Sequence, residues 1–196
     1  MALNRKLIVV FSFLLPGIFY GQMPPGQYSS VNKKAIRYLE EGKRAYEVKK
    51  DDVAEKNFRK ALEEDPKFIE PALGLGGLCQ EKGRHEEAVT YFKQAIAVNP
   101  KFFPNAFYFL SGSQLALGHY EEAKTSLETF LKFERVNPTT RENAEKFLTN
   151  ARFGAEAVKK PKPYNPINVG DGINTTMNEY FSAVSADGNQ FIFTRG

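Results

Sequence analysis

The residue types that most often carry chemistry are sparse in this sequence. It has one cysteine, Cys79, and two histidines, His85 and His119. These are too few for a conventional zinc site, and a single thiol cannot form an internal disulfide. Cys79 is flanked by leucines and has no predicted base partner, so we predict a small buried thiol and no nucleophile. We expect both histidines to be exposed in turns, 34 residues apart in the sequence. We predict no catalytic residue, metal site or cofactor.

Two other patterns that could bind ligands have simpler explanations. Gly74, Gly76 and Gly77 fall within a predicted helix, with no preceding strand and no following Lys-Ser or Lys-Thr, so close helix packing explains them better than a phosphate loop. Asp171 and Asp187 could bind calcium, but both fit turn positions, where an aspartate bonds the nearby backbone.

Composition places the chain among ordinary globular proteins. Of its 196 residues, 42% are hydrophobic and 26% are charged, and the length allows one domain with part of a second. There are 27 Lys and Arg against 23 Asp and Glu, a net charge of +4, and removal of Arg5 and Lys6 with a leader would leave 25 against 23, or +2. A nucleic-acid-binding domain has a denser basic patch, so we predict no nucleic-acid partner.

The N-terminal residues have the features of a secretory signal peptide. Arg5 and Lys6 precede an apolar run over residues 7–15 and a turn. The apolar stretch is too short to span a hydrocarbon core of about 30 Å comfortably as a helix. We therefore predict a signal peptide over residues 1–22, cleaved near Gly21, and hence an exported protein. An uncleaved amphipathic or core helix stays open as the alternative.

The centre of the sequence repeats itself with an offset of 34 residues. Gly42, Ala54, Phe58, Ala61 and Pro66 recur as Gly76, Ala88, Phe92, Ala95 and Pro100. A third copy follows at an offset of 35, since the residues 83–88 are echoed by 118–123. Within each copy, apolar residues recur at helical spacing on two segments of about 14 residues, separated by Gly or charged turn residues. The pattern predicts helical hairpins that approach closely at their small residues and stack to share a core.

These copies resemble the tetratricopeptide repeat, whose pattern has glycine, alanine and aromatic residues at these positions and a proline near its end. The first copy, 35–68, and the second, 69–102, match well. The third, 104–137, is degenerate: Ser111 takes the place of the glycine and Leu127 that of the aromatic. We expect the domain to cover residues 33–158, after a spacer at 23–32, and to end in a capping helix over 140–158.

The resemblance also implies a binding surface. In this family the first helices of successive hairpins line a concave groove that takes a peptide or extended segment of a protein partner. Six residues at the corresponding positions are the candidate partner-binding residues: Lys43, Tyr46, Glu70, Gln80, Asn105 and Tyr108. Leu39 and Leu73 are also at groove positions but could equally pack the solenoid. Leu39 and Lys43 depart from the family's clamp for acidic chaperone tails, so capture of an acidic C-terminus is not predicted.

The helical periodicity of the sequence ends before the C-terminal residues. After a basic, proline-containing linker at 159–164, the sequence around Asp187-Gly188 is typical of two short strands joined by a turn. Residues 165–196 resemble the first blade of the WD40-like propeller repeats of TolB-type proteins. A propeller has several four-stranded blades, so we expect the protein to continue beyond this sequence.

Together these features predict a mainly α protein: a tetratricopeptide solenoid, a capping helix and a short β-hairpin from an incomplete propeller. The combination resembles Gram-negative envelope proteins that end in an OmpA-like domain, some linked to type IX secretion. The resemblance implies a non-enzymatic scaffold in the periplasm or at the outer membrane that binds a protein partner, with outer-membrane or peptidoglycan association through the later domains. The alternative is a docking arm of an exported propeller enzyme, such as a hydrolase, whose active site lies outside this sequence.

Overall fold

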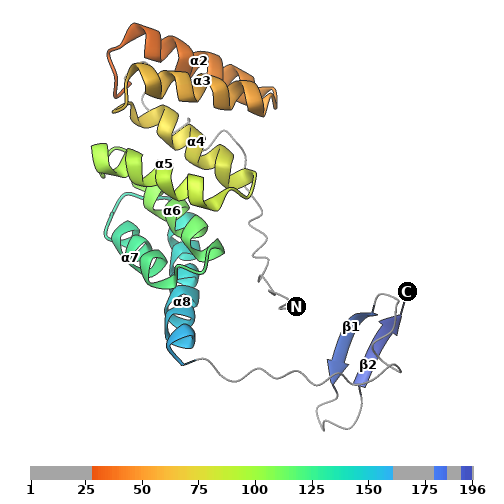
Figure 1. The fold of residues 1–196 in the computed structure, drawn as a ribbon. Coiled ribbons are helices and arrows are strands. Elements are labelled where there is room, and N and C mark those ends of the chain that lie inside the picture. Colours follow the sequence, from red (N-terminus) through yellow and green to blue (C-terminus); the bar gives the residue numbers. More distant parts are fainter. Residues whose placement is uncertain (1–27, 161–178, 185–190, 196) are drawn as a thin grey trace. The chain divides into compact units, whose positions relative to one another are not determined.

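The computed structural model of the chain describes residues 28–160, 179–184 and 191–195 (Figure 1). It divides into two units, Met1–Lys160 and Pro161–Gly196. The predicted signal peptide, residues 23–27 of the predicted spacer, most of the linker and the Asp187-Gly188 turn lie outside the described residues.

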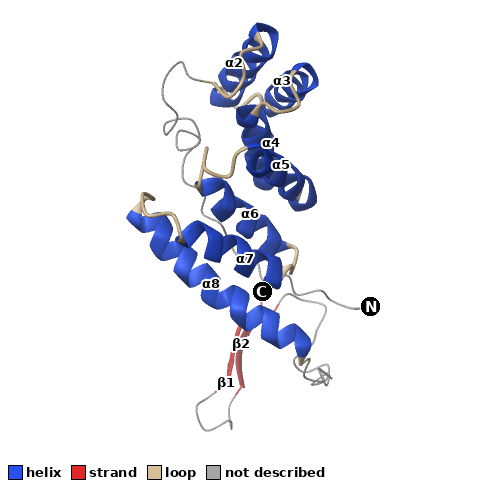
Figure 2. Ribbon diagram, turned by 90° about the vertical axis from the view of Figure 1, so that its left-hand side faces the viewer, coloured by secondary structure: helices blue, strands red, loops and turns tan. Residues whose placement is uncertain are grey.

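The first unit is built from helical hairpins, as predicted, and seven helices lie in its described part. Three hairpins follow one another: α2 (Lys33–Glu47) with α3 (Asp51–Glu64), α4 (Ile69–Glu81) with α5 (His85–Val98), and α6 (Asn105–Ala116) with α7 (Tyr120–Leu131). Helix α8 (Pro138–Lys159) packs on α7. The hairpins stack in chain order, with α3 against α4 and α5 against α6 (Figures 1 and 2).

The same backbone turn joins the helices of every hairpin. One residue in each turn has a positive φ: 58° at Lys49, 73° at Gly83 and 77° at Gly118. The next residue donates its backbone N–H to the carbonyl five residues back, from Arg84 to Cys79 at 2.8 Å and equivalently in the other two hairpins. This is the Schellman ending, which bonds carbonyls that the helix would otherwise leave without partners.

Within the hairpins, a glycine of the first helix faces an aromatic ring of the second. A Cβ atom on Gly42 would lie 2.6 Å from Phe58, and one on Gly76 would lie 2.7 Å from Phe92. The helices therefore approach more closely than an alanine would allow, which confirms the predicted role of these small residues. In the third hairpin, Ser111 and Leu127 are both fully buried.

The core consists of three clusters, and α4 contributes to two of them. Leu75 and Leu78 pack with the first hairpin, whereas Leu73 and Cys79 pack with the second. The third cluster joins α7 and α8. Almost every residue of α4 from Ile69 to Gln80 is buried, Gly74 being half-buried, because helices of neighbouring hairpins pack on both of its sides.

Helix α8 begins two residues before the predicted capping helix. The Asn137 side chain accepts the backbone N–H groups of Thr139 and Thr140 at 2.9 and 3.2 Å, and Pro138 occupies the first turn, where its missing N–H costs nothing. Further along, Gly154 lies against the ring of Tyr120, which leaves no room for a Cβ atom. No helix in the described residues is long and apolar enough to cross a membrane.

The second unit contains two short strands in its described residues. Strand β1 (Glu179–Val184) pairs antiparallel with β2 (Phe191–Arg195). Glu179 is opposite Arg195 and Val184 is opposite Phe191, with an irregularity in the register between Tyr180 and Ala183.

Candidate partner-binding face

Helices α2, α4 and α6 are neighbours and form one side of the first unit, which we call the first-helix face. The Tyr46 hydroxyl on α2 donates a hydrogen bond to Glu81 on α4. The Gln80 side-chain amide on α4 donates to the Phe109 carbonyl at 3.0 Å and to the Ser113 hydroxyl at 2.9 Å, both on α6. These bonds hold the three helices in a fixed order along the face.

Most of the predicted partner-binding residues are more buried on this face than the sequence suggested. Tyr46 and Gln80 are each 6% exposed, Asn105 is 5% exposed and Glu70 is fully buried. Burial and the bond to Glu81 raise the pKa of Tyr46 well above its ordinary value. Leu39 and Leu73 are also buried, so they pack the solenoid.

Tyr108 is a packing residue of the third hairpin. Its ring lies 5.6 Å from that of Phe109, 5.7 Å from Phe130 and 5.7 Å from Phe147, measured between centroids. Burial raises the pKa of Tyr108 to about 12. A substitution there would therefore disturb contacts of α6 with α7 and α8 before it disturbed any partner.

Lys43 is half-buried on α2. Its ammonium lies 3.0 Å from a carboxylate oxygen of Glu40 and 5.8 Å from the centroid of the Tyr28 ring. Its charge is thus balanced within the chain. The Glu40 carboxylate also accepts a hydrogen bond from Tyr28, and the hydrogen bonds from Tyr28 and Lys43 lower its pKa although burial opposes them.

Gln80 has one polar atom that no group satisfies. Its Nε2 makes the two bonds to α6, but among the described residues its buried Oε1 has no hydrogen-bond partner. A buried carbonyl oxygen without a donor costs roughly 1–3 kcal/mol, so a partner N–H that displaced the side chains covering this atom would relieve that cost.

Residues Tyr28–Asn32, which we call the strap, contact the first two hairpins. Ser29 donates its backbone N–H to Glu70 at 2.8 Å and its hydroxyl to the other oxygen of the same carboxylate. The Ser29 hydroxyl also accepts the Ile69 N–H at 2.9 Å, at the start of α4, where Phe68 provides no side-chain cap. The Ser30 hydroxyl donates to Asp65 at 2.5 Å.

The predicted spacer is therefore ordered structure over its described part. Asn32 caps α2 by accepting the N–H groups of Lys34 and Ala35 at 3.0 and 3.2 Å. Its side-chain amide donates to the Glu64 carbonyl at 3.0 Å. The Asn before a helical run is a sequence signal for the cap, but the bonds to residues 64–70 leave no periodic signal that could have predicted them.

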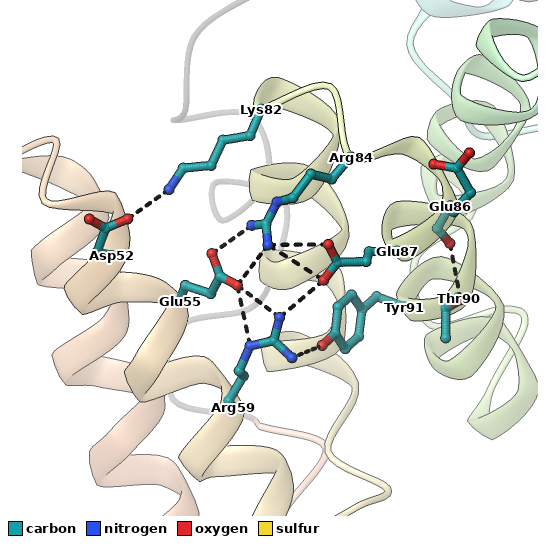
Figure 3. A network of polar contacts seen from close by, with 9 residues as sticks. All are labelled: Asp52, Glu55, Arg59, Lys82, Arg84, Glu86, Glu87, Thr90 and Tyr91. Atoms are coloured by element: carbon teal, nitrogen blue, oxygen red, sulfur yellow. Dashed lines mark hydrogen bonds and ion pairs between the residues drawn. The ribbon is translucent and has the colours of Figure 1, made fainter.

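The opposite side, made by α3, α5 and α7, carries a network of ion pairs (Figure 3). Glu55 lies 2.6 Å from Arg84 and 2.8 Å from Arg59, and Arg59 reaches Glu87 on α5 at 3.1 Å. Arg59 also donates to the Tyr91 hydroxyl at 2.5 Å. Hydrogen bonds from Arg84 and then Arg59 lower the pKa of Glu55 to about 2. These contacts join the first and second hairpins.

The cysteine and the two histidines occupy structural positions. Cys79 is fully buried, as predicted, and burial raises the pKa of its thiol to about 11. His119 is exposed before α7, whereas His85 is half-buried as the first residue of α5. In the part of the chain that the structure describes, no three metal-ligating residues come together.

Comparison with known proteins agrees with this arrangement. The tetratricopeptide-repeat family model matches residues 52–101 and 80–138, which cover nearly all of α3 and the whole of the second and third hairpins. The helical unit has the tetratricopeptide-repeat fold. The match bears out the repeats predicted from the 34-residue offset.

Solved tetratricopeptide structures superimpose on the helical part of the chain. The second TPR domain of human RPAP3, in complex with the HSP70 peptide SGPTIEEVD, has a TM-score of 0.54 and 22% identity over 61% of this chain and 95% of its own. The TPR2B domain of yeast Sti1, in complex with pHsp70, has a TM-score of 0.54 and 19% identity over 61% and 97%. The Yersinia enterocolitica type III secretion chaperone SycD, in complex with a YopD peptide, has a TM-score of 0.54 and 19% identity over 61% and 93%.

Proposed function

We propose that this chain is a non-enzymatic interaction module that holds an extended segment of a protein partner on the first-helix face. The observation that carries the proposal is the unsatisfied Oε1 of Gln80, at the middle of a face whose helices are fixed to one another by hydrogen bonds. Tetratricopeptide domains of this fold were solved with peptides bound, which supports the proposal.

The face suits an extended segment because its scaffold is rigid and its polar atoms are already placed. Gln80 is held by two bonds to α6, and its buried oxygen can accept a partner's backbone N–H once the side chains that cover it move aside. A main-chain N–H is common to every peptide segment, which makes this contact a source of affinity. Specificity then depends on the side chains on either side of it.

The test uses peptides selected from a random library on the full chain. Their affinities are measured by fluorescence polarisation for the wild type, for Gln80→Leu and for Gln94→Leu. Gln94 is a matched control: a half-buried glutamine of α5 whose amide donates to the Pro66 carbonyl at 3.0 Å. Because Gln80→Leu removes one hydrogen bond to the peptide, we expect it to weaken peptide binding roughly threefold to tenfold. Equal affinities for wild type and Gln80→Leu, with the helices intact by circular dichroism, would contradict the proposal.

We further propose that the chain is exported and that residues 165–196 begin a WD40-like propeller, so that the module serves the cell envelope of a Gram-negative bacterium. The support is the charged and apolar leader in the sequence and the antiparallel pairing of β1 with β2. N-terminal sequencing of the protein from its own cells tests the leader: a mature chain that starts near residue 22 supports export. The downstream coding sequence tests the propeller, since further blades support a scaffold and catalytic motifs support a docking arm for an enzyme.

A further inference from the structure

Glu70 is a fully buried carboxylate whose partners come from the strap. In the described residues no lysine or arginine pairs with it, and its hydrogen bonds come from the Ser29 N–H and the Ser29 hydroxyl. A buried carboxylate without donors is strongly unfavourable, because water solvates the charge far better than an apolar interior does. Glu70 therefore requires donors from whatever segment covers it.

Two neighbouring carboxylates also accept hydrogen bonds from the strap. Glu40 on α2 accepts the Tyr28 hydroxyl, and Asp65 before α4 accepts the Ser30 hydroxyl at 2.5 Å. All three acceptors are carboxylates of the repeats, and each accepts a hydroxyl or amide hydrogen of the strap, although Glu40 is also paired with Lys43 and Asp65 also accepts the Lys67 N–H. The charges of the repeats therefore favour a donor-rich segment and oppose an acidic one.

The strap itself is held mainly by exchangeable polar contacts. Ser29 is exposed although it covers Glu70, and Val31 is 95% exposed. Tyr28 is half-buried and meets Phe68 edge-on, with 6.2 Å between ring centroids. Apart from Ser30, no strap side chain is buried, so little apolar area opposes its release.

We propose that Tyr28, Ser29 and Ser30 are an internal ligand of the first-helix face. The part of the face between α2 and α4 recognises extended segments with consecutive hydroxyl side chains, and a partner segment of this kind displaces the strap when it binds. This inference rests on the proposed function, since it assumes that the face takes an extended segment, and it adds the chemistry of that segment.

The experiment asks whether the strap sequence binds in trans. The probe is a fluorescein-labelled peptide of residues 24–32, titrated with the full chain. A released variant carries Tyr28→Phe, Ser29→Ala and Ser30→Ala, and it keeps Asn32 so that α2 retains its cap. We expect the probe to bind the released variant at least tenfold more tightly than the wild type, whose site is already filled. A probe with glutamate in place of both serines should not bind.

Two further variants in the released background locate the site. Glu70→Gln should weaken probe binding about tenfold or more, because hydrogen bonds to a charged acceptor are the stronger kind. Glu63→Gln, which changes an exposed glutamate of α3, should leave binding unchanged. If the released variant loses helicity by circular dichroism, Ser29→Ala alone is measured in its place, and the same order of affinities is expected.

Equal affinity of the probe for the wild type and the released or Ser29→Ala variant would overturn the proposal and leave the strap as a structural brace. The two proposals can also fail separately. Library peptides that depend on Gln80 but do not compete with the strap probe would support the proposed function and refute this inference. A strap probe that binds through Glu70, with no library peptide dependent on Gln80, would do the reverse.

Discussion

At the scale of single residues, Lys49 is the position at which the three helical turns differ. It has φ of 58° where the other hairpins have Gly83 and Gly118 at 73° and 77°. A side chain with a Cβ atom loses about 1–2 kcal/mol in this left-handed conformation, and glycine does not. Lys49→Gly should therefore raise the free energy of unfolding by about 0.5–1 kcal/mol, less than the full strain because the contact of Lys49 with the Tyr46 ring is lost. Urea denaturation measures the change.

The reverse substitution is the control for this prediction. Apart from its chain neighbours, no heavy atom of the described residues lies within 4 Å of a Cβ atom placed on Gly83, so Gly83→Ala meets no steric obstacle and changes only the backbone preference. We expect it to lower the stability by about 1 kcal/mol. An unchanged or lowered stability of Lys49→Gly, together with a neutral Gly83→Ala, would show that the turn relaxes away from positive φ.

A second prediction concerns the contact of Gly76 with Phe92. Phe92 is fully buried, so Gly76→Ala forces the ring or the helix to move and should cost about 1–3 kcal/mol. At the equivalent repeat positions the third hairpin has Ser111, which is larger than glycine, and Leu127, which is smaller than phenylalanine, and both are buried. Gly76→Ala combined with Phe92→Leu should therefore cost less than the sum of the two single changes. Additive free energies in a double-mutant cycle would refute this coupling.

At the scale of helices, the Glu55 network makes the joint between the first two hairpins sensitive to pH. The pKa of Glu55 falls from its ordinary value of 4.5 to about 2 in the folded chain. Because the pKa of Glu55 is lower in the folded chain than in the unfolded chain, the ionised carboxylate stabilises the fold at pH values above about 4.5. This stabilisation is lost as the pH falls from about 4.5 towards 2. The contribution at pH 7 is at most about 3 kcal/mol.

The measurement compares unfolding in urea at pH 7 and pH 3. The wild type should be more stable than Glu55→Gln at pH 7, and the difference should shrink at pH 3, where the Glu55 carboxylate begins to take up a proton. Glu63 is an exposed glutamate of the same helix, and the difference in stability between the wild type and Glu63→Gln should be the same at both pH values. A wild-type advantage over Glu55→Gln that is equal at both pH values would exclude the network as a source of this stability.

The helices themselves were largely predictable from the sequence, because periodic features specify them. The offset of 34 residues put Gly42 and Gly76, and likewise Phe58 and Phe92, at equivalent positions of the repeats, and the structure shows that these glycines face these rings. The start of α8 was placed two residues late because the apolar period begins at 140, whereas Asn137 and Pro138 start the helix through capping and a fixed φ.

The surface was less predictable for a physical reason. Position within a repeat tells which side of a helix a residue is on, but not what covers it. Glu70 was correctly placed on a first helix, yet Ser29 buries it through bonds that span 41 residues and have no sequence period. Tyr46 and Tyr108 were predicted to meet a partner, and no feature of the sequence indicated that each also contacts a neighbouring helix, through Glu81 and through the α7 and α8 rings.

At the scale of the whole helical unit, α4 is the element on which the other hairpins depend. Its Leu75 and Leu78 are fully buried against the first hairpin, and its opposite side packs in the second cluster. A solenoid is stabilised by its units and by the interfaces between neighbours, so the effect of a substitution depends on its place in the stack. Leu75→Ala should lower the stability by about 2–5 kcal/mol and should disrupt the joint between the first two hairpins.

Hydrogen exchange distinguishes this central position from an end. Gly154→Val should place a side chain against the Tyr120 ring, so we expect faster exchange in α8 and little change in α2 to α5. Leu75→Ala should instead speed exchange in α2, α3 and α4 together, since the first hairpin has no other hairpin to pack on among the described residues. If both variants change exchange equally in every helix, the unit unfolds as a single cooperative block.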